Sequence, residues 1–412
     1  MDKKASASYP TILISLFLLI SLGVIILGYV ITNKPLLLVN FVEMPGLDYI
    51  DYFRASTNIL DRQSPYQILN ARYVTTPIPA LLNTIFVPFG FELARNMMFV
   101  LIPLSVVLAI FIASRLFPFS KADRNQIFLG GVVVLLCSYP FHFLLNRANI
   151  DGWVLLFICA GLFFHQKPKK EWLSGLFFSL AIVFKIYPVL ILIPVVLYRR
   201  WKLLMWCVIG LVFWGLLSSF WFLDFQDVLL ERSQNLLRLD ENGSLYATTA
   251  LIFVLLGTLG VSIKSSLMLI SIIPFIVAIS YALMISIVVY TDFKAGKDQK
   301  EGILPFTLYI PFMMALPQTV YHYSFIVLLM LIPTICFLWQ VTPKRSLMIS
   351  FMMIGLCMTQ WQAIATSLLT QNVFSHAIPG LGLLLLMVSV TIYKLETLHQ
   401  IKHVLPPVNS KP

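Results

Sequence analysis

The chain has 412 residues, of which 59% are hydrophobic and only 11% are charged, and its mean hydropathy is +0.88. Because soluble domains carry about 25% charged residues, this composition excludes a soluble protein and indicates a polytopic membrane protein. The net charge of +11 is expected to reflect orientation in the membrane, and no nucleic-acid partner is expected. All five cysteines lie in apolar runs, so neither a disulfide framework nor a metal cluster is predicted, and no metal or other cofactor is expected.

Apolar runs long enough to cross a bilayer as helices follow one another along most of the chain. They predict an all-α bundle of about 12 transmembrane helices. This bundle forms a single domain over 1–394, followed by a loose tail at 395–412. The short runs 79–92 and 245–259 are interpreted as segments that do not cross. The predicted spans are 11–32, 97–117, 127–145, 151–166, 172–185, 187–199, 203–222, 264–290, 303–317, 322–340, 346–366 and 377–394.

The positions of the basic residues predict the orientation. With both termini in the cytoplasm, this scheme places most of the 29 lysines and arginines on the cytoplasmic side, as the positive-inside rule requires. The two long polar segments, 33–77 and 223–244, then lie outside. A bacterial plasma membrane is the expected location, with membrane lipids around the spans.

The first outer segment contains the most suggestive polar stretch, 46–55. A helix there places Asp48 and Asp51 on one face, with Arg54 one turn after Asp51. Tyrosine and phenylalanine side chains fill the opposite face, so the sequence predicts an amphipathic helix on the membrane surface. The alternative is a solvated helix that carries an ion pair between Asp51 and Arg54.

Further polar residues gather on the same predicted side of the membrane. Arg147 and Asn149 occupy a short turn between two spans, and Asp151 is interpreted as the N-cap of the second. Lys185 interrupts an apolar run just before a proline, which predicts a broken helix whose ammonium suits a phosphate, the alternative being a snorkelling lysine. Tyr321 and His322 lie at another outer boundary, where they could bind phosphate or belong to an aromatic belt.

Four stretches in this order resemble glycosyltransferase family 87, within the GT-C superfamily of membrane glycosyltransferases. The stretch 48–55 (DYIDYFRA) with 64–66 (SPY) is similar to the family's D-F-x-x-Y-Y-x-A and G-x-P-Y. The turn 146–151 (NRANID) stands where many members have G-Q-x-N. The run 175–188 resembles G-L-x-x-x-A-x-x-x-K-x-x-P, and 321–323 (YHY) includes the family's H-Y. The likeness covers about 40–345.

This resemblance implies a GT-C-like bundle with an active site on the non-cytoplasmic side and a polyprenyl-phosphate sugar donor. Asp48 matches the catalytic aspartate, the expected general base, while Lys185, Arg147 and His322 match positions that hold the donor phosphate. Arg147 departs from the glutamine that is common in the family. The expected reaction is inverting transfer of mannose or a similar sugar to the hydroxyl of a glycan or glycolipid. The remaining substrate-binding candidates are Asp51, Arg54, Asn149 and Tyr321.

Two other functions fit parts of the pattern. A lipid-linked oligosaccharide polymerase or ligase also uses lipid-linked sugars, but typically has arginine-rich outer loops. A transporter of a lipid or small solute also has broken helices and buried charges, but usually shows related halves, and no internal repeat is visible in this sequence.

Overall fold

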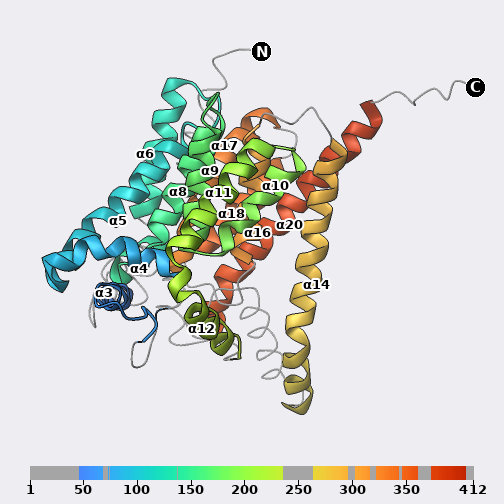
Figure 1. The fold of residues 1–412 in the computed structure, drawn as a ribbon. Coiled ribbons are helices and arrows are strands. Elements are labelled where there is room, and N and C mark those ends of the chain that lie inside the picture. The colour runs from blue at the N-terminus through green and yellow to red at the C-terminus, as the bar shows by residue number, and fades with distance from the viewer. Residues whose placement is uncertain are drawn as a thin grey trace, which may run out of the picture.

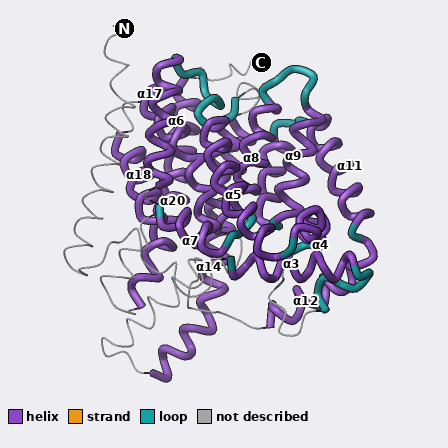
Figure 2. Tube along the Cα trace, turned by 90° about the vertical axis from the view of Figure 1, so that its left-hand side faces the viewer, coloured by secondary structure: helices purple, strands orange, loops and turns teal. Residues whose placement is uncertain are grey.

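A computed structural model of the protein describes residues 46–67, 73, 75–136, 138–234, 263–295, 302–315, 322–342, 346–360 and 373–404. Every regular element within these ranges is a helix (Figures 1 and 2). The elements of the first half are α3 (Leu47–Leu60), α4 (Pro77–Asn83), η2 (Thr84–Phe89), α5 (Phe91–Ala113), α6 (Lys121–Leu136), α7 (Tyr139–Arg147), α8 (Asp151–His165), α9 (Glu171–Phe184), η3 (Tyr187–Ile191) and α10 (Leu192–Leu197). Those of the second half are α11 (Trp201–Leu217), η4 (Ser219–Trp221), α12 (Phe222–Gln234), α14 (Ile263–Ala295), α15 (Leu304–Leu308), α16 (Ile310–Ala315), η6 (His322–Met330), α17 (Leu331–Val341), α18 (Ser346–Gln360) and α20 (Val373–Val404).

The predicted spans that lie among the described residues overlap these helices, although 187–199, 303–317 and 322–340 each fall on two short helices. The spans 151–166 and 172–185, for example, correspond to α8 and α9 almost residue for residue. Four helices in the described part are long and apolar enough to cross a membrane, or up to six if each of two bent helix pairs is one span. The predicted count of 12 is therefore not confirmed. The span 11–32 and the run 245–259 lie outside the described residues.

Helix length explains the difference in count. Several apolar helices, such as α8 with 15 residues and α9 with 14 residues, are shorter than a full span. At about 1.5 Å per residue, such a helix falls short of a hydrocarbon core about 30 Å thick. The ends of these short helices are therefore where polar residues can meet within the bundle.

Neighbouring helices of the bundle pack in both relative directions: α8 and α9 are antiparallel, whereas α9 runs parallel to α11, with Gly175 against Cys207 and Ser179 against Gly210. The strongest pairs are α8 with α9, α9 with α11, α5 with α8, and α18 with α20. In both views α3, α4 and α12 lie at the same end of the bundle (Figures 1 and 2). Helix α14 stands at one edge, where its main neighbour is α20 (Figure 1).

Two segments differ from their predicted form. The segment 395–412 was expected to be a loose tail, but α20 continues through 395–404, because no glycine or proline interrupts it before Pro406. In the polar segment 223–244, the residues up to Gln234 belong to helix α12, and 235–244 lies outside the described residues.

Glycines allow a close helix crossing between α18 and α20. Gly355 of α18 faces Gly382 of α20, and a Cβ built on Gly355 would lie 2.8 Å from the carbonyl oxygen of Gly382. Small residues at such crossings are typical of membrane helices, because they bring two backbones into van der Waals contact. The α18–α20 pair thus depends on the absence of side chains at these two positions.

We expect Gly355→Ala to lower the stability of the fold by about 1–3 kcal/mol, because the clash is with backbone and not with a mobile side chain. The matched control is Gly215→Ala in α11, where a Cβ would meet nothing within 4 Å. There alanine is expected to be neutral or to stabilise the helix. Thermal unfolding in detergent measures both, and equal melting temperatures for the two variants would contradict the expectation.

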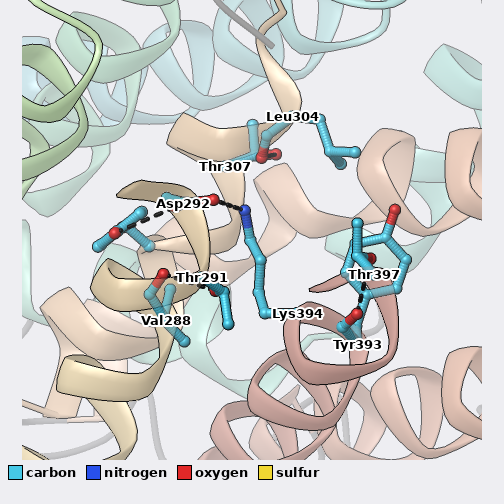
Figure 3. Close-up of polar contacts among 9 residues, drawn as sticks. Val288, Thr291, Asp292, Leu304, Thr307, Tyr393, Lys394 and Thr397 are labelled. Atoms are coloured by element: carbon cyan, nitrogen blue, oxygen red, sulfur yellow. Dashed lines mark hydrogen bonds and ion pairs between the residues drawn. The ribbon is translucent and has the colours of Figure 1, made fainter. Parts of the chain in front are cut away.

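A buried ion pair ties α14 to α20. Lys394 of α20 reaches the carboxylate of Asp292 on α14, as Figure 3 shows, and their side chains are 5% and 1% exposed. The hydroxyl of Tyr309 donates a second hydrogen bond to Asp292, over 3.2 Å. Because α14 stands at the edge of the bundle, this pair is a principal polar link between that helix and the rest of the fold.

Candidate active site

The site begins at the first turn of α3, where Asp48 is the second helical residue. Gly46 precedes the helix with a φ of 86°, in the left-handed region that favours glycine. Its N–H donates to the backbone carbonyl of Asn146 over 2.6 Å, which fixes the start of α3 against the end of α7. Asp48 is thereby placed beside the turn between α7 and α8.

That turn points two side chains at Asp48. Helix α7 ends at Arg147, and Ala148 adopts the left-handed conformation, with φ of 48° and ψ of 49°. The N–H groups of Ala148 and Asn149 bond back to the carbonyls of Leu145 and Leu144, the pattern of a Schellman turn. The chain therefore reverses within a few residues.

Asp48 accepts hydrogen bonds from both sides of this turn. Asn149 Nδ2 donates to Asp48 Oδ2 over 2.6 Å, and Arg147 Nη1 donates to Asp48 Oδ1 over 3.4 Å. The side chains of Asp48 and Arg147 are 21% and 19% exposed, so the pair lies at the edge of the buried region. The structure thus brings Asp48 together with two predicted site residues that lie 99 and 101 positions further along the chain.

Asp151 is not the N-cap that the sequence suggested. Ile150 occupies that position, and Asp151 is the first residue of α8, with a side chain that is fully buried. Its Oδ1 accepts a hydrogen bond from the Tyr187 hydroxyl over 2.7 Å, and its Oδ2 lies 3.4 Å from Lys185 Nζ. The capping prediction failed because tertiary partners, contributed by the segment after α9, compete for the carboxylate.

The broken helix predicted at Lys185 is confirmed. Helix α9 ends at Phe184, Lys185 has an extended backbone with φ of −146° and ψ of 137°, and η3 begins at Tyr187. The hydroxyl of Thr76, just before α4, donates to the carbonyl of Val183, one of those left free at the end of α9. The break turns Lys185 toward Asp151, and its side chain stays 19% exposed.

The helix termini match the charges that they carry. Asp48 and Asp151 lie in the first turns of α3 and α8, whereas Arg147 ends α7 and Lys185 follows the last residue of α9. Helix dipoles favour acids at N-termini and cations at C-termini. Four helix ends therefore bring two acids and two cations together. Asn149 links the Asp48–Arg147 pair to the Asp151–Lys185 pair, because its NH₂ group bonds to Asp48 and its oxygen accepts from the Asp151 N–H.

A tyrosine of α3 lies close to both acids. Burial, followed by the negative charge of Asp48, raises the pKa of Tyr52 well above its ordinary value of 10.0, and the charge of Asp151 adds to the effect. Tyr52 therefore stays a neutral phenol, and its ring packs edge-on against Tyr73 at 5.6 Å.

The remaining candidate site residues are Asp51, Arg54, His322 and Tyr321. Asp51 is half-buried and Arg54 exposed on α3, and their roles in binding substrate stay predictions. His322 is the first residue of η6, which packs against α7 and α8, but its side chain lies outside the described part, as does all of Tyr321. Sequence reasoning missed Tyr187 as a site residue; a tyrosine beside the lysine of a broken helix was the available signal.

The fold and this site define a multi-pass, all-helical membrane protein with paired acids and cations at converging helix ends. The model of glycosyltransferase family 87 matches residues 73–299, more than half of the chain. The chain belongs to this family and is a membrane glycosyltransferase. Arg147, Asn149, Asp151 and Lys185 fall within the matched range, whereas Asp48 and His322 fall outside it.

The comparison with solved structures finds the crystal structure of ArnT from Cupriavidus metallidurans bound to undecaprenyl phosphate. The identity is 15% and the TM-score 0.42, over 96% of this chain and 81% of that one. The comparison with curated proteins finds no match.

Proposed function

We propose that the protein transfers a sugar from a polyprenyl-phosphate donor to an acceptor hydroxyl on the non-cytoplasmic face of the membrane, with inversion. Asp48 is the general base, and Arg147 and Lys185 bind the donor phosphate, together with His322. The observation that carries this proposal is the joining of Asp48 to Arg147, Asn149, Asp151 and Lys185 through contacts of 2.6–3.4 Å. A base and two cations at that spacing suit a reaction in which a hydroxyl attacks while a phosphate leaves.

Asp48 has the properties of a base that acts on a bound hydroxyl. One-fifth of its side chain is exposed, so an acceptor can reach it, and its Oδ2 is fixed by the short bond from Asn149. Its Oδ1 is held by Arg147 at 3.4 Å, which is longer than the 2.7–2.9 Å usual for a charge-assisted hydrogen bond. A donor phosphate that attracts Arg147 frees Oδ1 to take the proton of the acceptor.

The leaving group is an anion that needs fixed positive charge. Arg147 and Lys185 are each about four-fifths buried, at 19% exposure, so solvent screens them less than it screens surface cations. Preorganised charges of this kind stabilise the negative charge that develops on the phosphate as the bond to the sugar breaks. Asp48 takes the proton of the acceptor hydroxyl as the hydroxyl oxygen bonds to the anomeric carbon. The bond between that carbon and the phosphate oxygen breaks, and polyprenyl phosphate departs.

The orientation rests on the positive-inside rule. Lys167, Lys169 and Lys170 follow α8, and Arg199 and Arg200 follow α10, just before Lys202 in the first turn of α11. These basic residues lie at the ends of α8 and α10 away from Asp151 and Lys185. If they are cytoplasmic, the candidate site is on the other side, as a lipid-linked sugar donor would require.

The test uses the purified full-length protein in detergent with a panel of radiolabelled polyprenyl-phosphate sugars, including mannose and arabinose donors, and extracted glycolipids as acceptors. We expect one donor to be consumed, with release of polyprenyl phosphate and a product of inverted anomeric configuration. Activity should persist in the presence of EDTA.

Two results would contradict the proposal. Use of a nucleotide sugar in place of every lipid-linked donor would remove the donor assignment. Transfer of a preassembled oligosaccharide block, with no transfer of single sugars, would favour the polymerase or ligase alternative.

A further inference from the structure

One residue of the site, Asp151, contacts both of its halves, one through its side chain and the other through its backbone, but takes no part in the proposed chemistry. Its carboxylate faces Lys185 and Tyr187, and its backbone N–H donates to Asn149 Oδ1 over 3.1 Å. We infer that Asp151 is a positioning residue that holds Lys185 at the phosphate position and fixes the turn that directs Asn149 at Asp48. This inference rests on the function proposed above and assigns to it a determinant of donor binding.

The two oxygens of Asp151 have different surroundings. The Tyr187 hydroxyl fixes Oδ1 over 2.7 Å, whereas Oδ2 accepts no hydrogen bond from any described residue and faces Lys185 Nζ at 3.4 Å. At that distance the two charges attract strongly in a buried setting, so the carboxylate holds the Lys185 ammonium in place.

The same residue sets the orientation of the Asn149 amide. Because the N–H of Asp151 donates to Asn149 Oδ1, the NH₂ group of Asn149 must point the other way, toward Asp48 Oδ2 at 2.6 Å. A flipped amide would place NH₂ against N–H and oxygen against carboxylate. Asp151 at the start of α8 thus couples the orientation of the base to the position of the cation.

Stability alone does not account for a carboxylate at this place. A buried ion pair contributes little net stability compared with apolar side chains of similar size. The chain also provides a comparison in Asp292 with Lys394, a second pair with a buried aspartate, on two helices, α14 and α20, that supply none of the site residues. Substitution of Asp292 therefore measures what the loss of a buried, paired carboxylate costs in stability at a place that contacts none of the described site residues.

The experiment compares wild type with Asp151→Asn and, as the matched control, Asp292→Asn, all as full-length protein in detergent. The first readout is the rate of reductive dimethylation of Lys185, followed by peptide mass spectrometry, with and without undecaprenyl phosphate. The exposed lysines Lys167, Lys169 and Lys170 serve as internal references. The second readout is the separate measurement of kcat and of KM for the donor.

In Asp151→Asn we expect Lys185 to be labelled several-fold faster, because its ammonium loses the carboxylate that holds it. The KM for the donor should rise by about 10- to 100-fold, the size of effect that a misplaced binding group produces. Asp292→Asn should lower the melting temperature but leave Lys185 labelling and the donor KM as in wild type. Equal labelling of Lys185 in wild type and Asp151→Asn would overturn the inference.

Failure of the proposed function would give a result distinct from failure of the positioning role. If undecaprenyl phosphate does not slow Lys185 labelling in wild type, the donor assignment is overturned, whatever Asp151→Asn shows. If Asp151→Asn does not fold, Tyr187→Phe replaces it, because this change removes only the hydroxyl that fixes Oδ1. Both oxygens then draw Lys185 toward Asp151, so labelling should slow and the donor KM should rise about tenfold. Wild-type values of both in Tyr187→Phe would overturn the positioning role.

Discussion

Asp48→Asn is expected to reduce sugar transfer by about 10²–10⁴-fold, the usual contribution of a general base. The amide has the size of the carboxylate and still offers an oxygen to Asn149 or Arg147, so the fold and the turn 146–151 should be retained. What is lost is the ability to take the proton of the attacking hydroxyl. The loss should appear in kcat, with the KM for the donor little changed, because the donor phosphate is bound by other residues.

The matched control for this change is Asp61→Asn. Asp61 is an exposed acid at the other end of the same helix, where it forms the C-cap of α3. Its substitution should leave kcat and KM as in wild type. Single-turnover transfer with a radiolabelled donor measures both variants, and substantial turnover by Asp48→Asn with inversion retained would remove Asp48 from the role of base.

The second large effect is expected on stability. Lys394→Met leaves Asp292 buried without its counter-ion, and breaking one partner of a buried pair typically costs about 3–5 kcal/mol. Because the pair links the edge helix α14 to α20, its loss should loosen that helix before the rest of the bundle. Thermal unfolding in detergent, combined with protease sensitivity near α14, measures the change.

The double variant Asp292→Asn with Lys394→Met separates the two causes of that effect. Removing both charges takes away the uncompensated carboxylate, so we expect the double variant to recover most of the stability lost in Lys394→Met. If the double variant is as unstable as Lys394→Met alone, loss of side-chain packing, and not the unpaired charge, is the cause.

The converging helix ends explain how four charged side chains, Asp48, Asp151, Arg147 and Lys185, are accommodated together at the site. Each acid lies at a helix N-terminus and each cation at a helix C-terminus, where the dipole favours it. Because α8 and α9 are short, their ends lie within the protein. The charges are thereby partly desolvated, which strengthens their interactions with one another and with a phosphate.

The sequence by itself determined the class of the protein, the approximate bounds of most helices and the break at Lys185. These follow from local properties, namely apolar run length, proline and the cost of polar groups in lipid. It also indicated the family, and the match over 73–299 confirmed that. The number of spans was not determined in this way, because run length does not tell a full span from a short helix that ends inside the bundle.

Only the tertiary structure decided how the polar residues pair. Asp48 meets Arg147 and Asn149 across 99 and 101 positions of the chain, and Tyr187 meets Asp151 across 36. No local pattern specifies such partners, since an aspartate at the start of a helix reads equally well as a cap. The buried carboxylate of Asp151 instead takes its partners from the segment after α9, because a charge removed from water is stabilised by whichever cation and hydroxyl the packing of the helices brings to it.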